Sequence, residues 1–198
     1  MALLQKIKAA GLDYESYKQK IDAIVATANP DVLDALENER LGFTKLNQHR
    51  INRVDKTYEP SSMLKELMAK ITNHQVWMIL TAVWCGDSAQ NVPAIVKIAS
   101  LNPLVEVKLL ERDENLEIMD QFLSNGSRSI PKVVAFDEEG RIVFEWGSRP
   151  AEVQQIVTDL KGQGIAKQVW EEKLHLWYAR NRSKALEAEM IAKLEPGH

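Results

Sequence analysis

The chain has 198 residues, of which 45% are hydrophobic and 27% charged, enough for one compact domain with additional helices. Its net charge of −3, without a run of Lys and Arg, argues against nucleic-acid binding. The N-terminus lacks the pattern of a signal peptide and no stretch of about 18 apolar residues occurs, so we expect a cytoplasmic protein with no membrane partner. A single cysteine excludes an intramolecular disulfide and a cysteine-based metal cluster, in agreement with a reducing compartment.

Residues 1–58 have the pattern of a helical extension. An apolar stripe at helical spacing predicts the first helix, and its members are Tyr14, Tyr17, Ile21, Ile24 and Val25. Asn29 followed by Pro30 predicts the start of a second helix, which Gly42 is expected to interrupt. No strand pattern precedes residue 75.

Residues 59–162 alternate helix and strand patterns and are expected to form the main domain. Strand, helix and strand in succession predict parallel pairing, and the turn at residues 137–140 predicts an antiparallel hairpin at one edge. The fold class is therefore α/β, with a mixed sheet flanked by helices. The predicted strands are 76–83, 105–110, 132–136 and 141–146, and the predicted helices are 61–71, 89–99, 115–123 and 150–160.

Residues 163–198 predict a C-terminal helical extension. From about Ala166 to Leu194 the sequence favours a helix and contains no proline, with an apolar side made of Trp170, Leu174, Trp177 and Tyr178. We expect this helix to pack on the N-terminal extension.

Cys85 is the only cysteine, and it lies where the strand at 76–83 gives way to a helix. A lone cysteine can be merely a small buried hydrophobe. A helix N-terminus, however, carries partial positive charge and free N–H groups that stabilise a thiolate. The position therefore predicts a nucleophilic Cys85 with a pKa below that of free cysteine.

The chain resembles the thioredoxin-like family over roughly residues 60–162. The motif Trp84-Cys85-Gly86-Asp87-Ser88 lies at a strand-to-helix junction, and Pro93 follows eight residues after the cysteine. Ile130-Pro131 precedes a hairpin strand and Gly147 follows the next strand, both at the family's positions. The resemblance implies a thioredoxin-like fold with a cis bond at Ile130-Pro131, and the added helices are similar to those of a bacterial subfamily.

Two departures restrict the chemistry that the resemblance implies. Thioredoxins carry a second, resolving cysteine where this chain has Ser88, and a buried aspartate where it has Ile79. Dithiol turnover is therefore excluded. Ser88 is expected to donate a hydrogen bond to the Cys85 thiolate, so the candidate catalytic residues are Cys85 and Ser88.

The resemblance then implies single-cysteine exchange with an oxidised or thiolated protein or a small disulfide. No bound cofactor is expected, although a small thiol such as glutathione would serve as co-substrate. Arg128 is either a partner for a carboxylate of that thiol or a solvated cation. Asp87 either disfavours the thiolate or is simply an exposed residue of the first helical turn. The candidate substrate-binding residues are Trp84, Gly86, Asp87, Arg128, Ile130, Pro131 and Gly147.

The competing hypothesis is a redox-inactive module that binds an extended peptide. The loop at 84–88, Ile130-Pro131 and Trp146 would then form the binding platform. The four histidines are scattered, with no spacing typical of a metal site or of a base beside Cys85, so each is expected at a surface or interface and no metal is expected.

Overall fold

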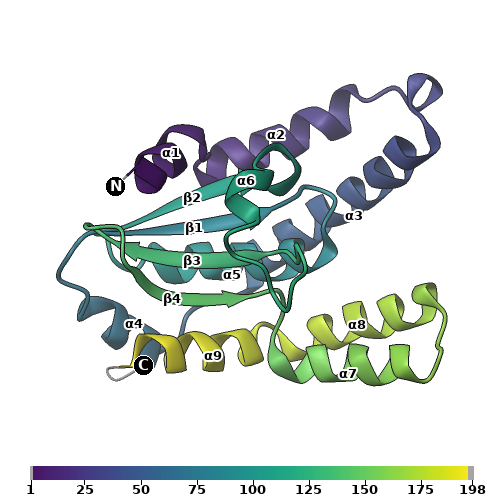
Figure 1. Ribbon diagram of the computed structural model, residues 1–198. Coiled ribbons are helices and arrows are strands. Elements are labelled where there is room, and N and C mark those ends of the chain that lie inside the picture. The colour runs from purple at the N-terminus through teal and green to yellow at the C-terminus, as the bar shows by residue number, and fades with distance from the viewer. Residues whose placement is uncertain (1, 196–198) are drawn as a thin grey trace.

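The computed structural model describes residues 2–195, which form a four-stranded sheet with helices on both faces (Figure 1). Among these residues no helix combines the length and apolar character needed to cross a membrane. The strands are β1 (Gln75–Thr81), β2 (Val105–Glu111), β3 (Lys132–Asp137) and β4 (Ile142–Gly147). The helices are α1 (Ala2–Ala10), α2 (Tyr14–Thr27), α3 (Ala35–Thr57), α4 (Ser62–Ala69), α5 (Gly86–Ala99), α6 (Leu116–Met119), α7 (Ala151–Gly162), α8 (Lys167–Asn181) and α9 (Lys184–Leu194), with short 3-10 helices η1 (Pro30–Val32) and η2 (Arg112–Glu114).

The strand order β2-β1-β3-β4 confirms the predicted mixed sheet. β1 pairs parallel with β2, which the crossover helix α5 permits, and antiparallel with β3. β3 and β4 form the predicted hairpin, with a register shift between Ala135 and Phe136. Apart from Gln75, every residue of β1 is buried, as expected of a central strand covered on both faces.

Side chains alternate between two hydrophobic clusters, one on each face of the sheet. Trp77 and Ile79 of β1 face the larger cluster, built with α2, α3, α4, α5 and α9. Met78 and Leu80 face the smaller cluster, built with α1 and α6. Cys85 belongs to this second cluster, at the end of the sheet where β1 stops.

The N-terminal extension differs from its prediction in two respects. The second helix, α3, begins at Ala35 rather than at about Pro30, where the 3-10 helix η1 lies instead. α3 runs through Gly42 without interruption, so the prediction of a break there was wrong. Asp34 and Glu37 form a capping box that starts α3 after η1. A glycine inside a helix costs about 1 kcal/mol, and the burial of Leu41 and Ile51 in the same helix outweighs it.

Two of the predicted helices are shorter than expected. The helix predicted over 115–123 is the single turn α6, and the C-terminal helix is divided into α8 and α9. The division falls at Arg182 and Ser183, which both have positive φ and end the helical ladder. The chain direction thus changes, and Leu186 and Met190 of α9 become fully buried in the larger cluster.

The α7-α8 hairpin forms a separate layer with its own small hydrophobic cluster (Figure 1). Val153 and Val157 of α7 pack there against Leu174 and Tyr178 of α8. Glu189 of α9 fixes the base of the hairpin, since it accepts hydrogen bonds from Trp146 Nε1 at 2.6 Å and from the backbone N–H of Ala151 at 2.7 Å. The hairpin is thereby held beside the end of the sheet that carries Cys85.

Candidate functional site

Cys85 immediately precedes α5 and makes no side-chain cap to that helix. It is buried, with 8% of the residue exposed. Its Sγ lies 3.5 Å from the carbonyl oxygen of Ile130, and the Ile130-Pro131 peptide bond is cis. The structure therefore brings Cys85 and the Ile130-Pro131 pair, 45 residues apart, into direct contact.

The Cys85 thiol is not activated in this arrangement. Burial raises its pKa to about 11, and the negative charge of Asp87 raises it further in the same direction. Nearby donors of Ser88 and Asp87 favour the thiolate but offset only part of this effect. The expectation of a lowered pKa is therefore wrong, because the loss of hydration outweighs the helix N-terminus.

Ser88 lies one turn into α5, and its hydroxyl oxygen is buried without a hydrogen-bond partner within residues 2–195. The expected hydrogen bond to Cys85 is not formed while the sulfur is a thiol. The unpaired Ser88 hydroxyl can donate a hydrogen bond, and the neighbouring sulfur would become its acceptor on losing the proton.

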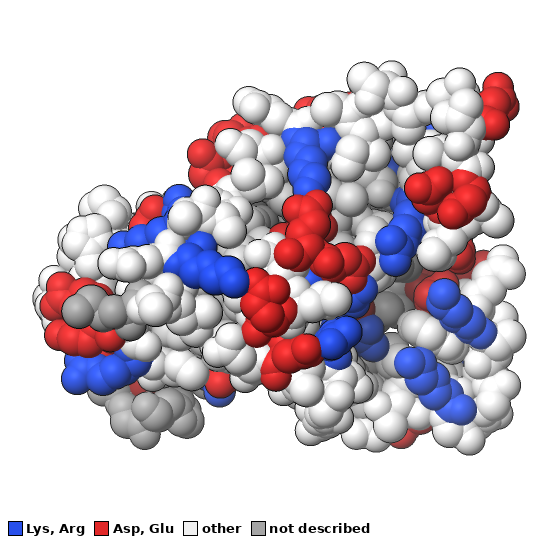
Figure 2. All heavy atoms as spheres, turned by 45° about the horizontal axis from the view of Figure 1, so that its top comes forward, with Lys and Arg blue, Asp and Glu red and all other residues white. Residues whose placement is uncertain are grey.

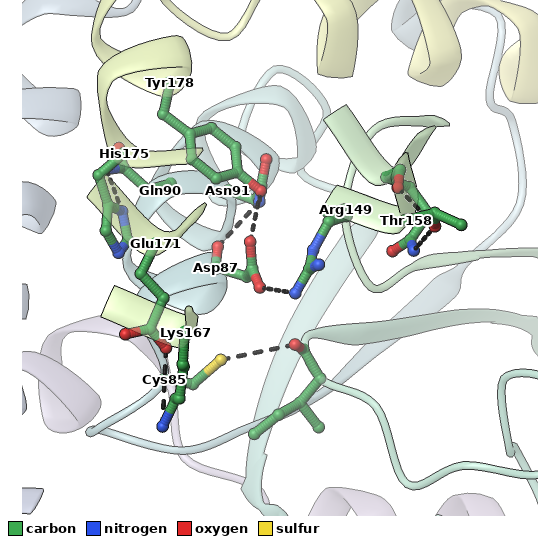
Figure 3. A network of polar contacts seen from close by, with 12 residues as sticks. Cys85, Asp87, Gln90, Asn91, Arg149, Thr158, Lys167, Glu171, His175 and Tyr178 are labelled. Carbon is green, nitrogen blue, oxygen red and sulfur yellow. Dashed lines mark hydrogen bonds and ion pairs between the residues drawn. The ribbon is translucent and has the colours of Figure 1, made fainter. Parts of the chain in front are cut away.

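Asp87 is buried at the centre of a polar network rather than exposed, which corrects one of the two interpretations of this residue (Figure 3). Its carboxylate forms an ion pair with Arg149 and accepts a hydrogen bond of 2.7 Å from the hydroxyl of Tyr178. Asn91 Nδ2 donates to the Asp87 carbonyl at 2.8 Å and to the Tyr178 hydroxyl at 3.0 Å. Asp87 thus ties the N-terminus of α5 to the α7-α8 hairpin.

A cavity of about 840 Å³ opens beside Cys85, between α3 and α8. The molecule is hollowed in the view of Figure 2, where Lys and Arg side chains lie at the edge of the hollow. The polar lining includes Arg50 of α3 and His175 of α8, and the apolar lining includes Phe43, Trp84 and Trp170. Both helical extensions therefore contribute walls to the cavity that contains the cysteine.

Trp84 and Arg128 line the same cavity. The Trp84 ring lies between two guanidinium groups, 5.1 Å from that of Arg40 and 5.0 Å from that of Arg112. Arg128 is exposed and binds Asp120 through two contacts, of 2.6 and 2.8 Å. Its planar fork is thus already occupied by a carboxylate of the same chain.

Gly86 allows two side chains from the extensions to approach the motif. A Cβ on Gly86 would lie 2.8 Å from Cε1 of His175 and 3.3 Å from Nη1 of Arg50. Burial lowers the pKa of His175 to about 4, and the charges of Arg50, Arg149 and Arg53 act in the same direction. His175 is therefore neutral at pH 7 and lies against the residue that follows Cys85.

Gly147 lies beside Pro131 rather than on the cavity wall. Its φ is +133°, a conformation that side chains rarely adopt, and a Cβ there would lie 2.3 Å from the carbonyl oxygen of Pro131. Pro131 itself is buried. Gly147, which was predicted to bind substrate, thus supports the backbone that carries Pro131.

Sequence reasoning missed four residues of this site, because each reaches it from a distant part of the chain. Arg50 comes from the N-terminal extension, Arg149 from the turn after β4, and His175 and Tyr178 from α8. Among residues 2–195 no cluster of three or more metal-binding side chains occurs. The only local signal was the position of His175 and Tyr178, three residues apart on one helix.

Comparison with known proteins identifies the family. The family model described as thioredoxin matches residues 36–161. The chain is similar in structure to an HIV epitope-scaffold protein, with 18% identity, 98% of each chain covered and a TM-score of 0.61. It is also similar to a protein of unknown function from Pseudomonas aeruginosa, with 19% identity, 87% of this chain and 93% of that chain covered, and a TM-score of 0.52. No curated protein matches its sequence. Because the family model covers more than half of its residues, the chain belongs to the thioredoxin family.

Proposed function

We propose that the protein carries out thiol-disulfide exchange through Cys85 alone, by a mixed-disulfide mechanism. One observation carries the proposal: the sulfur of the only cysteine contacts the Ile130 carbonyl beside Pro131 and borders a cavity large enough for a substrate. A substrate disulfide placed against Ile130 would present one of its sulfur atoms to Cys85. The absence of a second cysteine makes the enzyme dependent on an external thiol.

The exchange balances with one external co-reactant. The Cys85 thiolate attacks one sulfur of the substrate disulfide, a mixed disulfide forms, and the other half leaves as a thiolate that takes up the proton lost by Cys85. The thiolate of a small thiol such as glutathione then attacks the substrate sulfur of the mixed disulfide, a disulfide between the small thiol and the substrate half leaves, and the released Cys85 thiolate takes up the proton lost by the small thiol. Such a thiol is the reductant of a cytoplasm, which is where we propose the protein acts.

In this scheme Ser88 acts as a hydrogen-bond donor to the Cys85 sulfur. Its unpaired hydroxyl would donate to the Cys85 sulfur when the proton leaves, and would donate again when the thiolate is regenerated. We therefore keep Cys85 as nucleophile and Ser88 as its supporting donor. The raised pKa of Cys85 makes the exchange slow at neutral pH, because little of the sulfur is then thiolate.

The test is the formation and release of the mixed disulfide. The protein is mixed with bis(2-hydroxyethyl) disulfide, and intact mass is followed before and after addition of glutathione. We expect one adduct on Cys85, its release by glutathione, and no adduct on Cys85→Ser. A folded protein that forms no adduct over the pH range 7 to 10 would contradict the proposal.

A redox-inactive binding module is the second candidate, and the raised pKa of Cys85 favours it. The platform predicted from the sequence is incomplete, however, because Trp146 is buried and bonded to Glu189 of α9. A binding module would have to use the cavity instead. It would retain its ligand in Cys85→Ser, whereas an exchange protein would lose covalent capture.

A further inference from the structure

We infer that the cavity beside Cys85 binds a small disulfide that carries a carboxylate, and that Arg50 is the group that recognises this carboxylate. The inference deepens the proposed exchange function and rests on it for the covalent step. It assigns recognition to a residue of α3, in the N-terminal helical extension.

Arg50 is the cavity cation without a carboxylate partner within residues 2–195. The other cations of the lining are each paired: Arg149 with Asp87, Arg112 with Asp113, Arg128 with Asp120, and Lys167 with Glu171 at 3.7 Å. Arg50 instead donates one hydrogen bond, of 2.8 Å, to the side-chain oxygen of Asn47. The remaining N–H groups of its fork are free for a bidentate contact with a carboxylate.

Arg50 is also held in a defined position next to the motif. Asn47, which is fully buried, accepts from Arg50 and donates from Nδ2 to the carbonyl of Val83 at 2.9 Å. Val83 is two residues before Cys85, so the contact links α3 directly to the reactive loop. The same nitrogen of Arg50, Nη1, also lies against Gly86. A carboxylate bound by Arg50 would thus be close to the backbone beside the sulfur.

The surrounding charges favour an anion at this point. Arg53 and Arg149 lie near enough to His175 to lower its pKa together with Arg50. Arg53 is bonded to Gln90 at 2.6 Å, and Gln90 contacts His175 at 3.4 Å. The acidic groups that face Arg50 are Asp87 and Glu171, each already paired with a cation. Glu172 also lines the cavity, so the positive charge available to an anionic ligand is local to Arg50.

The size of the cavity suits a small ligand. Cys85 is buried beside the cavity, and α8 forms a wall that is fixed to Asp87 by Tyr178 and lies against Gly86 through His175. The volume of about 840 Å³ is in the range of cavities that bind small molecules. Apolar side chains on both walls, among them Leu46 and Leu174, would contact the methylene groups of such a molecule.

The test uses three disulfides of similar size and different charge. These are 3,3′-dithiodipropionate (a dianion), bis(2-hydroxyethyl) disulfide (neutral) and cystamine (a dication). Rates of adduct formation on Cys85 are divided by the rates for the urea-unfolded chain, which removes intrinsic reactivity. We expect the dianion to react at least about tenfold faster than the dication at low salt, with the ratio falling as salt is added.

Arg50→Gln should abolish this preference, so that the normalised rates for the dianion and the dication become similar. Arg180→Gln, an equal loss of charge at an exposed position of α8, is the matched control and should retain it. Equal normalised rates for the three disulfides, or a preference unchanged in Arg50→Gln, would overturn the inference while leaving the exchange function in place.

A ligand that cannot react separates the binding site from the exchange chemistry. Suberate has the length of dithiodipropionate, with two methylene groups in place of the disulfide. Titration of the folded protein followed by NMR should shift the amide signals of Gly86 and Asn47 in the wild type and in Arg180→Gln, but not in Arg50→Gln. Suberate binding without any adduct would retain the anion site and refute the exchange function, and no Arg50-dependent shift would refute the anion site.

Discussion

Replacement of Asp87 by Asn should make Cys85 more reactive and the protein less stable. Asp87 raises the pKa of Cys85, so removal of its charge lowers that pKa. Arg149 would then face the sulfur as an uncompensated cation and act in the same direction. The loss of the Asp87 charge and the uncompensated charge of Arg149 both lower the pKa of Cys85 and so favour the thiolate.

The size of the effect follows from the ionisation of the thiol. With a pKa of about 11, only about 0.01% of Cys85 is thiolate at pH 7. A fall of about 1.5 in the pKa increases the thiolate about 30-fold, whereas the weaker nucleophile reacts about fivefold more slowly. The net expectation is an increase of about sixfold in the rate at pH 7.

Stability should change in the opposite sense. The side chains of Asp87 and Arg149 are 9% and 15% exposed, so the ion pair is largely buried. Leaving one charge of such a pair alone costs about 3 to 5 kcal/mol. Asn can still accept the hydrogen bond from Tyr178, which places the expected loss near the lower limit, about 3 kcal/mol.

Alkylation by iodoacetamide between pH 6 and pH 11, with mass detection, measures the pKa, and urea unfolding measures the stability. Asp120→Asn is the matched control, since it removes an exposed carboxylate that is also paired with an arginine. It should leave the Cys85 profile unchanged. A Cys85 pKa in folded Asp87→Asn equal to that of the wild type would refute the electrostatic argument. Reaction through unfolded molecules would be recognised because its rate rises steeply with urea.

Three further predictions concern neighbours of the motif. The pKa of His175 is lowered to about 4, so the unfolded chain binds one more proton than the folded chain between pH 6.5 and pH 4. The free energy of unfolding should therefore fall by up to about 3 kcal/mol over this range. Urea unfolding at several pH values measures this fall, and the contribution of His175 should be absent in His175→Gln. Gly86→Ala should displace the His175 ring, since the new Cβ would lie 2.8 Å from its Cε1. NMR titration should then give a His175 pKa closer to 6.5. An unchanged pKa would contradict the contact of His175 with Gly86. Gly147→Ala should cost about 3 kcal/mol or more in urea unfolding, because its Cβ would meet the Pro131 carbonyl at a φ of +133°, and a loss below 1 kcal/mol would refute this.

The sheet could be predicted because its signals are local. The apolar run that ends at Val83 and the hairpin turn at Gly140 each determine their structure within a few residues. The pairing of Cys85 with Ile130 followed from the family resemblance rather than from the pattern of either segment.

The environment of the site could not be predicted in the same way. Asp87 has the appearance of an exposed first-turn residue, and its burial depends on Tyr178, 91 residues later in the chain. The pKa of Cys85 depends on its burial and on the charge of Asp87, and no local pattern records how deeply the cysteine is buried. The end of α8 at Arg182 and Ser183 had no glycine or proline to indicate it. Tertiary packing decides each of these features.

The burial of Cys85 beside Asp87 also determines how the protein withstands oxidants. Hydrogen peroxide reacts with thiolates, and successive oxidation to sulfinic and sulfonic acids is irreversible without dedicated repair. A sulfur that is buried and almost entirely protonated at pH 7 reacts slowly with peroxide. The burial of Cys85 and the charge of Asp87 thus protect the one thiol of the chain from oxidation, and the same two features slow its exchange reactions.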